Sequence, residues 1–162
     1  MTELFSSPPR ALLDALAQPR GQALLLGHVH PDGDVLGTLL GAGLALEHAG
    51  WTVTFAGPHP VPDVLAFLPG AARWEVWTVA PRIFDVIVLT DCPDHARTEG
   101  LLEQARAAGS RVLNIDHHPD NRRYGTVNWI DPSAAATGEM IHELLSALGL
   151  TVTPEIALCL FT

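Results

Sequence analysis

The 162-residue chain has few cysteines and few basic residues, and each shortage argues against a class of protein. Its two cysteines, Cys92 and Cys159, lie far apart and lack the paired spacing of a zinc site, so a reducing compartment is expected. Nine basic residues stand against 18 acidic ones. The resulting formal net charge of −9 argues against a protein that follows duplex DNA through a basic stripe.

Several other signals are also absent from the sequence. No apolar run reaches the roughly 18 residues of a membrane-spanning helix, and no charged-then-apolar leader opens the chain. Glycine-rich phosphate loops are missing, because the Gly-Ala-Gly at 41–43 falls inside a predicted helix. The four tryptophans do not form the stacking array of a single-strand binder. We therefore expect a cytoplasmic protein without a membrane anchor.

Apolar residues are plentiful, at 48% of the chain with a mean hydropathy of +0.22, which is enough for a packed core. Short apolar runs alternate with segments of helical periodicity, as in parallel strands joined by crossover helices. We predict an α/β fold, a parallel β-sheet with helices on both faces that forms a Rossmann-like lobe. The predicted strands cover 23–26, 51–56, 86–89 and 111–115, with an extended segment at 124–130; the predicted helices cover 10–17, 36–50, 64–68, 98–108 and 132–148, and a last one begins at 154.

Acidic and histidine side chains follow three of the apolar runs. Because the carboxyl ends of parallel strands meet at one edge of a sheet, and ligands bind beyond that edge, we expect these side chains to form one site. The three clusters are His28, Asp32 and Asp34; Asp91; and Asp116, His117 and His118.

A metal centre is the best interpretation of these clusters. Carboxylates about 4 Å apart repel by roughly 4 kcal/mol per pair at an effective dielectric constant of 20, so the cluster requires cations or protonation. Carboxylate and imidazole donors without thiolate favour Mn²⁺, with Mg²⁺ or Co²⁺ as alternatives, and a carboxylate such as Asp91 can bridge two ions. Each cluster alone also has a structural interpretation, as a turn, a helix cap or a surface histidine pair. Their coincidence at strand ends favours the metal.

The remaining polar candidates carry weaker arguments. Arg97 is a weak candidate contact for a phosphate, and a solvated helix start explains it better. His30 is expected to lie behind the ligands or in solvent. We expect His48, His59 and His142 on the surface.

The clusters and the segment that follows them lie in four motifs: HVHPDGDVLGT at 28–38, VLTDCPD at 88–94, NIDHHPDN at 114–121 and WIDPSAAATGEM at 129–140. Together these motifs resemble the DHH phosphoesterase superfamily, in the branch that contains nano-RNases, pAp phosphatases and RecJ-like exonucleases. The resemblance implies two divalent cations, of which Mn²⁺ is favoured. His28 and Asp32 would hold one ion, Asp34 and His117 the other, and Asp91 would bridge them.

The resemblance also implies roles for the remaining residues. His118 would contact the scissile phosphate or protonate the leaving oxygen, and Asp116 would orient the histidines. Residues 1–162 then form the amino-terminal catalytic lobe. We expect this lobe to be truncated before the family's fourth motif, an Asp-Thr-Gly, and to lack the carboxyl-terminal DHH-associated domain.

The expected function is two-metal hydrolysis of short oligonucleotides or of small nucleotides such as pAp by the complete protein. A manganese inorganic pyrophosphatase and a non-catalytic metal- or nucleotide-binding module are the alternatives. The expected partners are the nucleotide substrate and the missing domain, and a homodimer is compatible with the sequence; duplex DNA and membranes are not expected.

Overall fold

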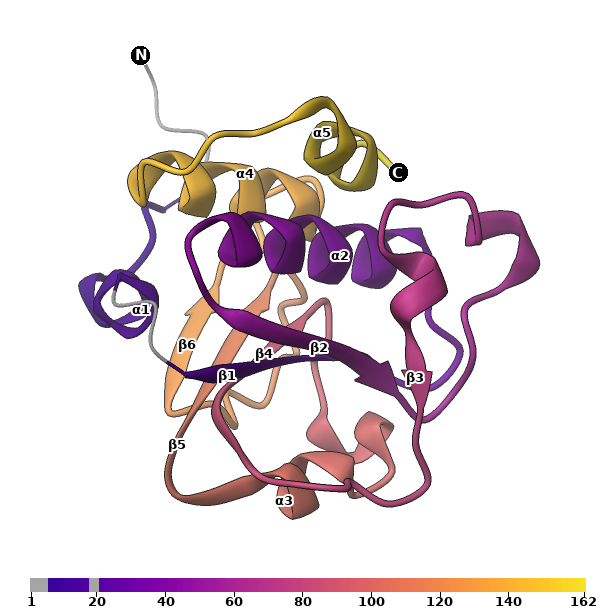
Figure 1. Ribbon diagram of the computed structural model, residues 1–162. Helices are drawn as coiled ribbons and strands as arrows, with labels where there is room; N and C mark the ends of the chain where they lie inside the picture. The colour runs from indigo at the N-terminus through magenta and orange to yellow at the C-terminus, as the bar shows by residue number, and fades with distance from the viewer. Residues whose placement is uncertain (1–5, 18–20) are drawn as a thin grey trace.

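The computed structural model describes residues 6–17 and 21–162, and a six-stranded parallel sheet lies at the centre of this part of the chain (Figure 1). The strand order is β3-β2-β1-β4-β5-β6. This arrangement confirms the predicted α/β fold. The strands are β1 (Gln22–Leu26), β2 (Thr52–Gly57), β3 (Glu75–Val76), β4 (Phe84–Thr90), β5 (Arg106–Asp116) and β6 (Val127–Ile130).

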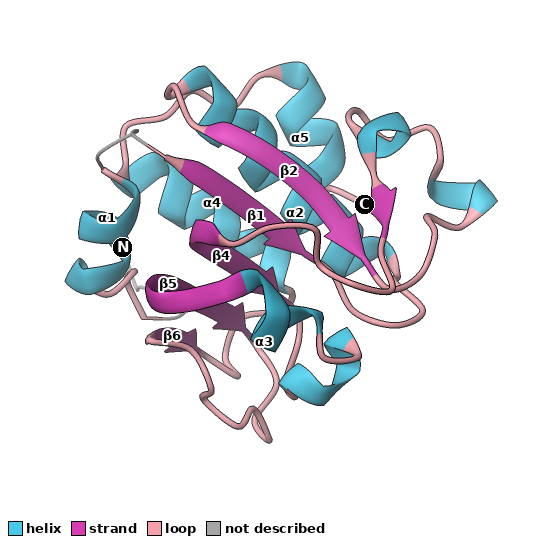
Figure 2. Ribbon diagram, turned by 60° about the horizontal axis from the view of Figure 1, so that its bottom comes forward, coloured by secondary structure: helices cyan, strands magenta, loops and turns pink. Residues whose placement is uncertain are grey.

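Helices lie on both faces of the sheet, as predicted. Figure 2 shows α2, α4 and α5 on one face and α3 on the other, while α1 contacts β6 near the edge of the sheet. Three short 3₁₀ helices lie in the connections. The α-helices are α1 (Arg10–Leu16), α2 (Gly33–His48), α3 (Leu101–Ala105), α4 (Thr137–Ala147) and α5 (Pro154–Leu160), and the 3₁₀ helices are η1 (Asp63–Leu65), η2 (Ala71–Arg73) and η3 (His95–Thr98).

The central strands are buried on both faces, which explains their continuous apolar sequences. In β1, Leu25 packs into the core under α2 and α4, whereas Leu24 and Leu26 pack into the second core under α3. The same alternation divides Val88 from Ile87 in β4. The sheet is therefore held rigidly between two helical layers, and its carboxyl edge is a fixed platform.

Close backbone packing joins α5 to α2. A Cβ atom added to Gly37 of α2 would lie 2.2 Å from the carbonyl oxygen of Cys159, and one added to Gly41 would lie 2.9 Å from the Leu160 side chain. Only glycine permits this approach. Thr162 follows α5 and lies against Gly33, at the amino end of α2.

The predicted helix at 98–108 is too long, because α3 ends at Ala105 and β5 begins at Arg106. The Ser110 hydroxyl accepts a hydrogen bond from the Ala107 amide and donates one to the Phe84 carbonyl, which holds this segment along β4. The pairing of β4 with β5 shifts register between Phe84 and Val86. The predicted helix at 64–68 is only the 3₁₀ turn η1.

The predicted start of the helix at 132–148 is also wrong. The Asp131 carboxylate instead accepts hydrogen bonds from Ser133 and from the Ser6 amide, so it closes a turn and ties down the amino-terminal segment. These hydrogen bonds lower the pKa of Asp131, and the bond from Ser133 is the largest cause. Helix α4 begins five residues later, at Thr137.

Candidate metal centre

The predicted clusters lie at the carboxyl ends of β1, β4 and β5, three strands that are adjacent in the sheet. Asp34 lies in the first turn of α2, directly after the loop that follows β1. Asp91 follows β4, and the Asp-His-His segment closes β5. The sheet topology therefore brings together residues that are more than 80 positions apart in the sequence.

Asp91 lies at the centre of the group. Its backbone has a positive φ of 50°, which is uncommon outside glycine but tolerated by aspartate, and its amide donates to the Ile115 carbonyl at 3.1 Å. One carboxylate oxygen of Asp91 lies 3.5 Å from His117 Nε2 and 3.4 Å from His118 Nδ1. The side chain is only 7% exposed, and burial together with the charge of Asp34 raises the pKa of Asp91 to about 7.

His117 presents one ring nitrogen to the carboxylates. Its Nδ1 lies 3.3 Å from the Ala134 carbonyl oxygen, which can only accept, so the neutral tautomer that fits this contact has its proton on Nδ1 and a lone pair on Nε2. That Nε2 atom lies between Asp91 Oδ1, at 3.5 Å, and Asp34 Oδ2, at 3.8 Å. A ring fixed in this tautomer is oriented as a metal ligand requires.

Asp34 has a structural role as well as its place in the site. The amides of Thr137 and Gly138 donate to its two carboxylate oxygens at 3.0 and 3.2 Å. Helix α4 has no cap from its own N-cap residue, Ala136, so Asp34 of α2 supplies it. These bonds leave lone pairs on both oxygens, and Asp34 Oδ2 still faces His117.

Asp116 is completely buried, and hydrogen bonds occupy both of its oxygens. One oxygen lies 2.8 Å from His118 Nδ1 and also accepts from the His118 amide; the other accepts from Asn121 Nδ2 at 2.6 Å. His118 Nε2 is therefore left for other partners. Burial alone would lower the pKa of His118, but the hydrogen bond to Asp116 and the charges of Asp116 and Asp91 outweigh it and raise the pKa.

His28 and Asp32 lie on the loop beside this group. His28 is fully buried; its Nδ1 bonds to the Val29 carbonyl at 2.8 Å, and its Nε2 has no hydrogen-bond partner. Burial is the main cause that lowers the pKa of His28, so the ring is neutral at neutral pH. Asp32 caps α2 by accepting from the Val35 amide, and its charge contributes to the raised pKa of Asp91.

Arg97 approaches the same loop from η3. Its carbonyl oxygen accepts from the Val29 amide at 2.9 Å, next to His28 in the sequence. Its positive charge contributes to the lowered pKa of His28. The predicted phosphate contact is thus close to the ligand loop.

The donors suit divalent cations. Among the described residues, Asp91, His117 and His118 form the one group whose ligand atoms all lie within 4.8 Å of one another, and the predicted ligands His28, Asp32 and Asp34 lie outside it. Two ligands that are each about 2.1 Å from one ion are separated by about 3.0–3.4 Å, so the distances from His117 Nε2 to the carboxylates require only small movements. A buried imidazole nitrogen without a partner, as in His28, is costly unless something binds it. Both observations favour metal.

Four residues that support the site were not predicted. Asn121 orients Asp116, Asn114 bonds to Asn121, Thr137 Oγ1 donates to Asp91 at 3.4 Å, and the Thr38 hydroxyl bonds to Thr90 at 2.7 Å. All four, and Thr90 as well, fall inside the segments that carry the family resemblance. Their presence in those motifs was the available signal, but their partners are visible only in the fold.

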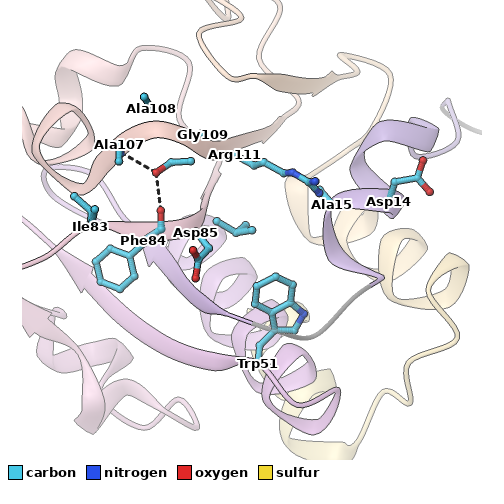
Figure 3. A pocket seen from close by; sticks show the side chains of 12 residues that line it. Asp14, Ala15, Trp51, Ile83, Phe84, Asp85, Ala107, Ala108, Gly109 and Arg111 are labelled. Carbon is cyan, nitrogen blue, oxygen red and sulfur yellow. Dashed lines mark hydrogen bonds between the residues drawn. The ribbon is translucent and has the colours of Figure 1, made fainter.

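A cavity of about 650 Å³ lies at the opposite, amino-terminal edge of the sheet (Figure 3). Asp14, Trp51, Asp85 and Arg111 line it together with Ile83 and the segment 107–110. Asp85 already accepts a hydrogen bond from the Gln22 amide at 2.8 Å. None of the predicted site residues lines this cavity.

The chain belongs to the DHH family, because the model of the DHH family's N-terminal domain matches residues 22–162. It is 33% identical over 150 residues to the bifunctional oligoribonuclease and PAP phosphatase NrnA of Thermus thermophilus, covering 91% of this chain and 44% of the relative. The protein of the same name from Bacillus subtilis is also 33% identical, over 75% of this chain and 37% of its own length. The chain thus spans less than half of these relatives.

The fold also matches a solved structure. An exopolyphosphatase-related protein from Bacteroides fragilis superposes with a TM-score of 0.85 and 22% identity, over the whole of this chain and 50% of the other. This similarity supports the α/β fold of a DHH domain. Among the described residues, no helix is long and apolar enough to cross a membrane.

Proposed function

We propose that the complete protein is a metal-dependent phosphoesterase that hydrolyses short oligoribonucleotides or small nucleotides such as pAp. The observation that carries this proposal is the meeting of Asp34, Asp91 and His117 around His117 Nε2, at 3.5 and 3.8 Å. The names of the relatives support the substrate class, since two of them are bifunctional oligoribonucleases and PAP phosphatases. They favour it over the pyrophosphatase alternative.

Five residues would hold two cations. In this proposal His28 and Asp32 would hold one ion, Asp34 and His117 would hold the other, and Asp91 would contact both. Cations bound there would supply an activated water as the nucleophile and would offset charge on the phosphoryl oxygens. Mn²⁺ suits this mixture of carboxylate and imidazole better than a structural zinc. The raised pKa of Asp91 fits the assignment, because the apoprotein lacks the positive charge that a central carboxylate needs.

His118 acts on the substrate rather than on the ions. Asp116 fixes the position of Nδ1, which leaves Nε2 to face the leaving group. The raised pKa of His118 favours the protonated ring, which can donate a proton to the departing oxygen. Asp116 orients the ring through its hydrogen bond with Nδ1. Arg97 is proposed as a contact to a phosphate oxygen, through its guanidinium group.

The proposed activity concerns a protein as long as its relatives. The ion held by His28 and Asp32 has, in this chain, three proposed protein ligands when Asp91 is included. We propose that a further ligand and the contacts to the far end of the substrate come from the part of the relatives that this chain does not span.

The experiment is Mn²⁺ calorimetry on this chain, combined with hydrolysis assays on pAp and on a dinucleotide. Two bound ions with turnover would assign the activity to the chain itself. Binding without turnover would make it a metal-binding lobe that is active only in the complete protein. No Mn²⁺ binding by the wild type would refute the metal centre. His48→Ala, at the far end of α2, is the control that shows whether any observed binding comes from an exposed histidine outside the site.

A further inference from the structure

A histidine outside the family motifs contacts the loop after β1, which carries His28 and Asp32. His59 lies on the connection after β2, in the sequence Pro58-His59-Pro60, and its side chain is partly buried rather than on the surface as predicted. Its Nδ1 accepts a hydrogen bond from the His30 amide at 3.1 Å. The rings of His30 and His59 meet edge to face, with centroids 4.5 Å apart.

His30 needs such a partner because its backbone is strained. It has a φ of 51°, in the left-handed region that residues with a Cβ atom rarely adopt. His30 lies two residues after His28 and two before Asp32, so its backbone sets the relative position of both. If His30 relaxes to a negative φ, the loop between these two residues has to follow another path.

Trp74, which follows η2, anchors His59 in turn. The indole Nε1 donates to the His59 carbonyl at 3.0 Å. The ring lies so close to the ends of β1 and β2 that a Cβ atom on either Gly27 or Gly57 would come within 2.6 Å of it. Two glycines and one tryptophan therefore fix the distance between the two loops. Pro58 and Pro60 restrict the backbone on each side of His59.

We propose that His59 is a positioning residue for the metal centre: it holds His30 in the left-handed conformation and thereby places His28 and Asp32 for one of the two ions. The inference rests on the proposed function, since it assigns these two residues to one ion. It requires His59 to carry its ring proton on Nε2, because Nδ1 accepts the amide. His59 itself contacts neither ion.

The first test needs no metal. In ¹⁵N-correlated NMR spectra of the apoprotein at pH 8, His59 should be the Nε2–H tautomer, and the His30 amide should be protected from hydrogen exchange. His59→Ala should accelerate exchange of the His30 amide by about tenfold, the upper end of what one hydrogen bond contributes. A protonated Nδ1 on His59, or unchanged exchange in the variant, would overturn the proposed role of the hydrogen bond between the His30 amide and His59.

The second test resolves the two ions. Zn²⁺ is diamagnetic, and a histidine ring nitrogen that binds it changes its own ¹⁵N chemical shift, so His28 and His117 report on the two positions separately during a Zn²⁺ titration. In His59→Ala, the affinity reported by His28 should fall about tenfold, while that reported by His117 stays within about twofold. His59→Asn should restore most of the loss, because the asparagine side-chain oxygen lies near the position of Nδ1. His48→Ala, which removes an exposed histidine, should change neither.

The outcomes separate this inference from the proposed function. Equal weakening at His28 and His117, with no rescue by His59→Asn, would mean that His59 only stabilises the fold, and a thermal melt of the same variant would show the loss. Normal binding at both positions in His59→Ala would overturn the positioning role and leave the metal centre intact. Absence of Mn²⁺ binding in wild type would refute the proposed function. The metal-free test would still show whether His59 holds the His30 backbone in place.

Discussion

Replacing Asp91 with asparagine should stabilise the metal-free protein while abolishing its response to metal. The carboxylate is buried, and its pKa is raised from 3.8 to about 7 by burial first and by the charge of Asp34 next. The folded state therefore binds a proton that the unfolded state releases. The free-energy cost of ionising Asp91 in the folded state is absent below about pH 4 and fully present above about pH 7. This group therefore makes the stability of the fold decrease as the pH rises.

The size of the effect follows from the shift. Three pKa units correspond to about 4 kcal/mol, which is an upper bound for a group in contact with a histidine. The amide keeps the acceptor oxygen for Thr137 but loses the attraction to His118, so we expect Asp91→Asn to gain about 1–3 kcal/mol at pH 8. At pH 5 the gain should fall to less than half, because the folded wild-type carboxyl is then protonated.

The assay is thermal denaturation in EDTA at pH 8 and pH 5, where a gain of this size raises Tm by roughly 3–10 °C. Asp116→Asn is the matched control, since it makes the same chemical change in a second buried aspartate. Asp116 is satisfied by His118 and Asn121, so its amide variant should lose about 2–3 kcal/mol. With Mn²⁺ added, wild type should gain stability and Asp91→Asn should not.

One result would refute this reasoning. If Asp91→Asn melts below wild type in EDTA at pH 8, the ionised carboxylate stabilises the apoprotein, and the site does not need cations to offset its charge. If instead both aspartate variants lose stability equally, the opposite surroundings of Asp91 and Asp116 have no energetic consequence. Either outcome would weaken the inference that the buried carboxylates of this site require bound cations.

Three further predictions concern the proposed roles and the packing of the site. In calorimetry, Asp91→Ala should lose more bound Mn²⁺ than Asp34→Ala, and equal occupancy in the two variants would contradict a bridging position. In a complete protein, His118→Ala should keep its ions and lose roughly 10²–10⁴ in kcat, while unchanged turnover would remove the proton donor. Gly37→Ala places a methyl group 2.2 Å from the Cys159 carbonyl and should lower the free energy of unfolding by about 1–3 kcal/mol, measured by urea denaturation.

The fold was predictable where burial controls the sequence. The runs at 23–26 and 86–89 are apolar because both faces of the central strands are covered, and both lie inside the observed strands. Prediction failed where a distant contact decides the structure. The alanines at 107–108 favour a helix by local propensity, but Ser110 binds the Phe84 carbonyl and draws this segment into β5.

The site shows the same division. The gathering of its acidic and histidine residues at one edge of the sheet was predictable, because such side chains at the ends of apolar runs are costly without a partner. Their orientation was not, because it depends on remote partners: the amide that binds Asp34 Oδ2 belongs to Thr137, 103 residues away. His59 escaped prediction because it belongs to no motif, and its role depends on a backbone angle that the sequence does not reveal.

Strain and uncompensated charge occur together at the carboxyl edge of the sheet. Of the four non-glycine residues with positive φ in the described part of the chain, His30 and Asp91 lie in the loops of the proposed centre. Such conformations persist only where the surroundings enforce them. Trp74 and His59 enforce one, and the bond from the Asp91 amide to β5 enforces the other. The two helical layers thus hold in place a group of carboxylates that is unfavourable by itself, and in the proposed metal centre bound cations would supply the counter-charge.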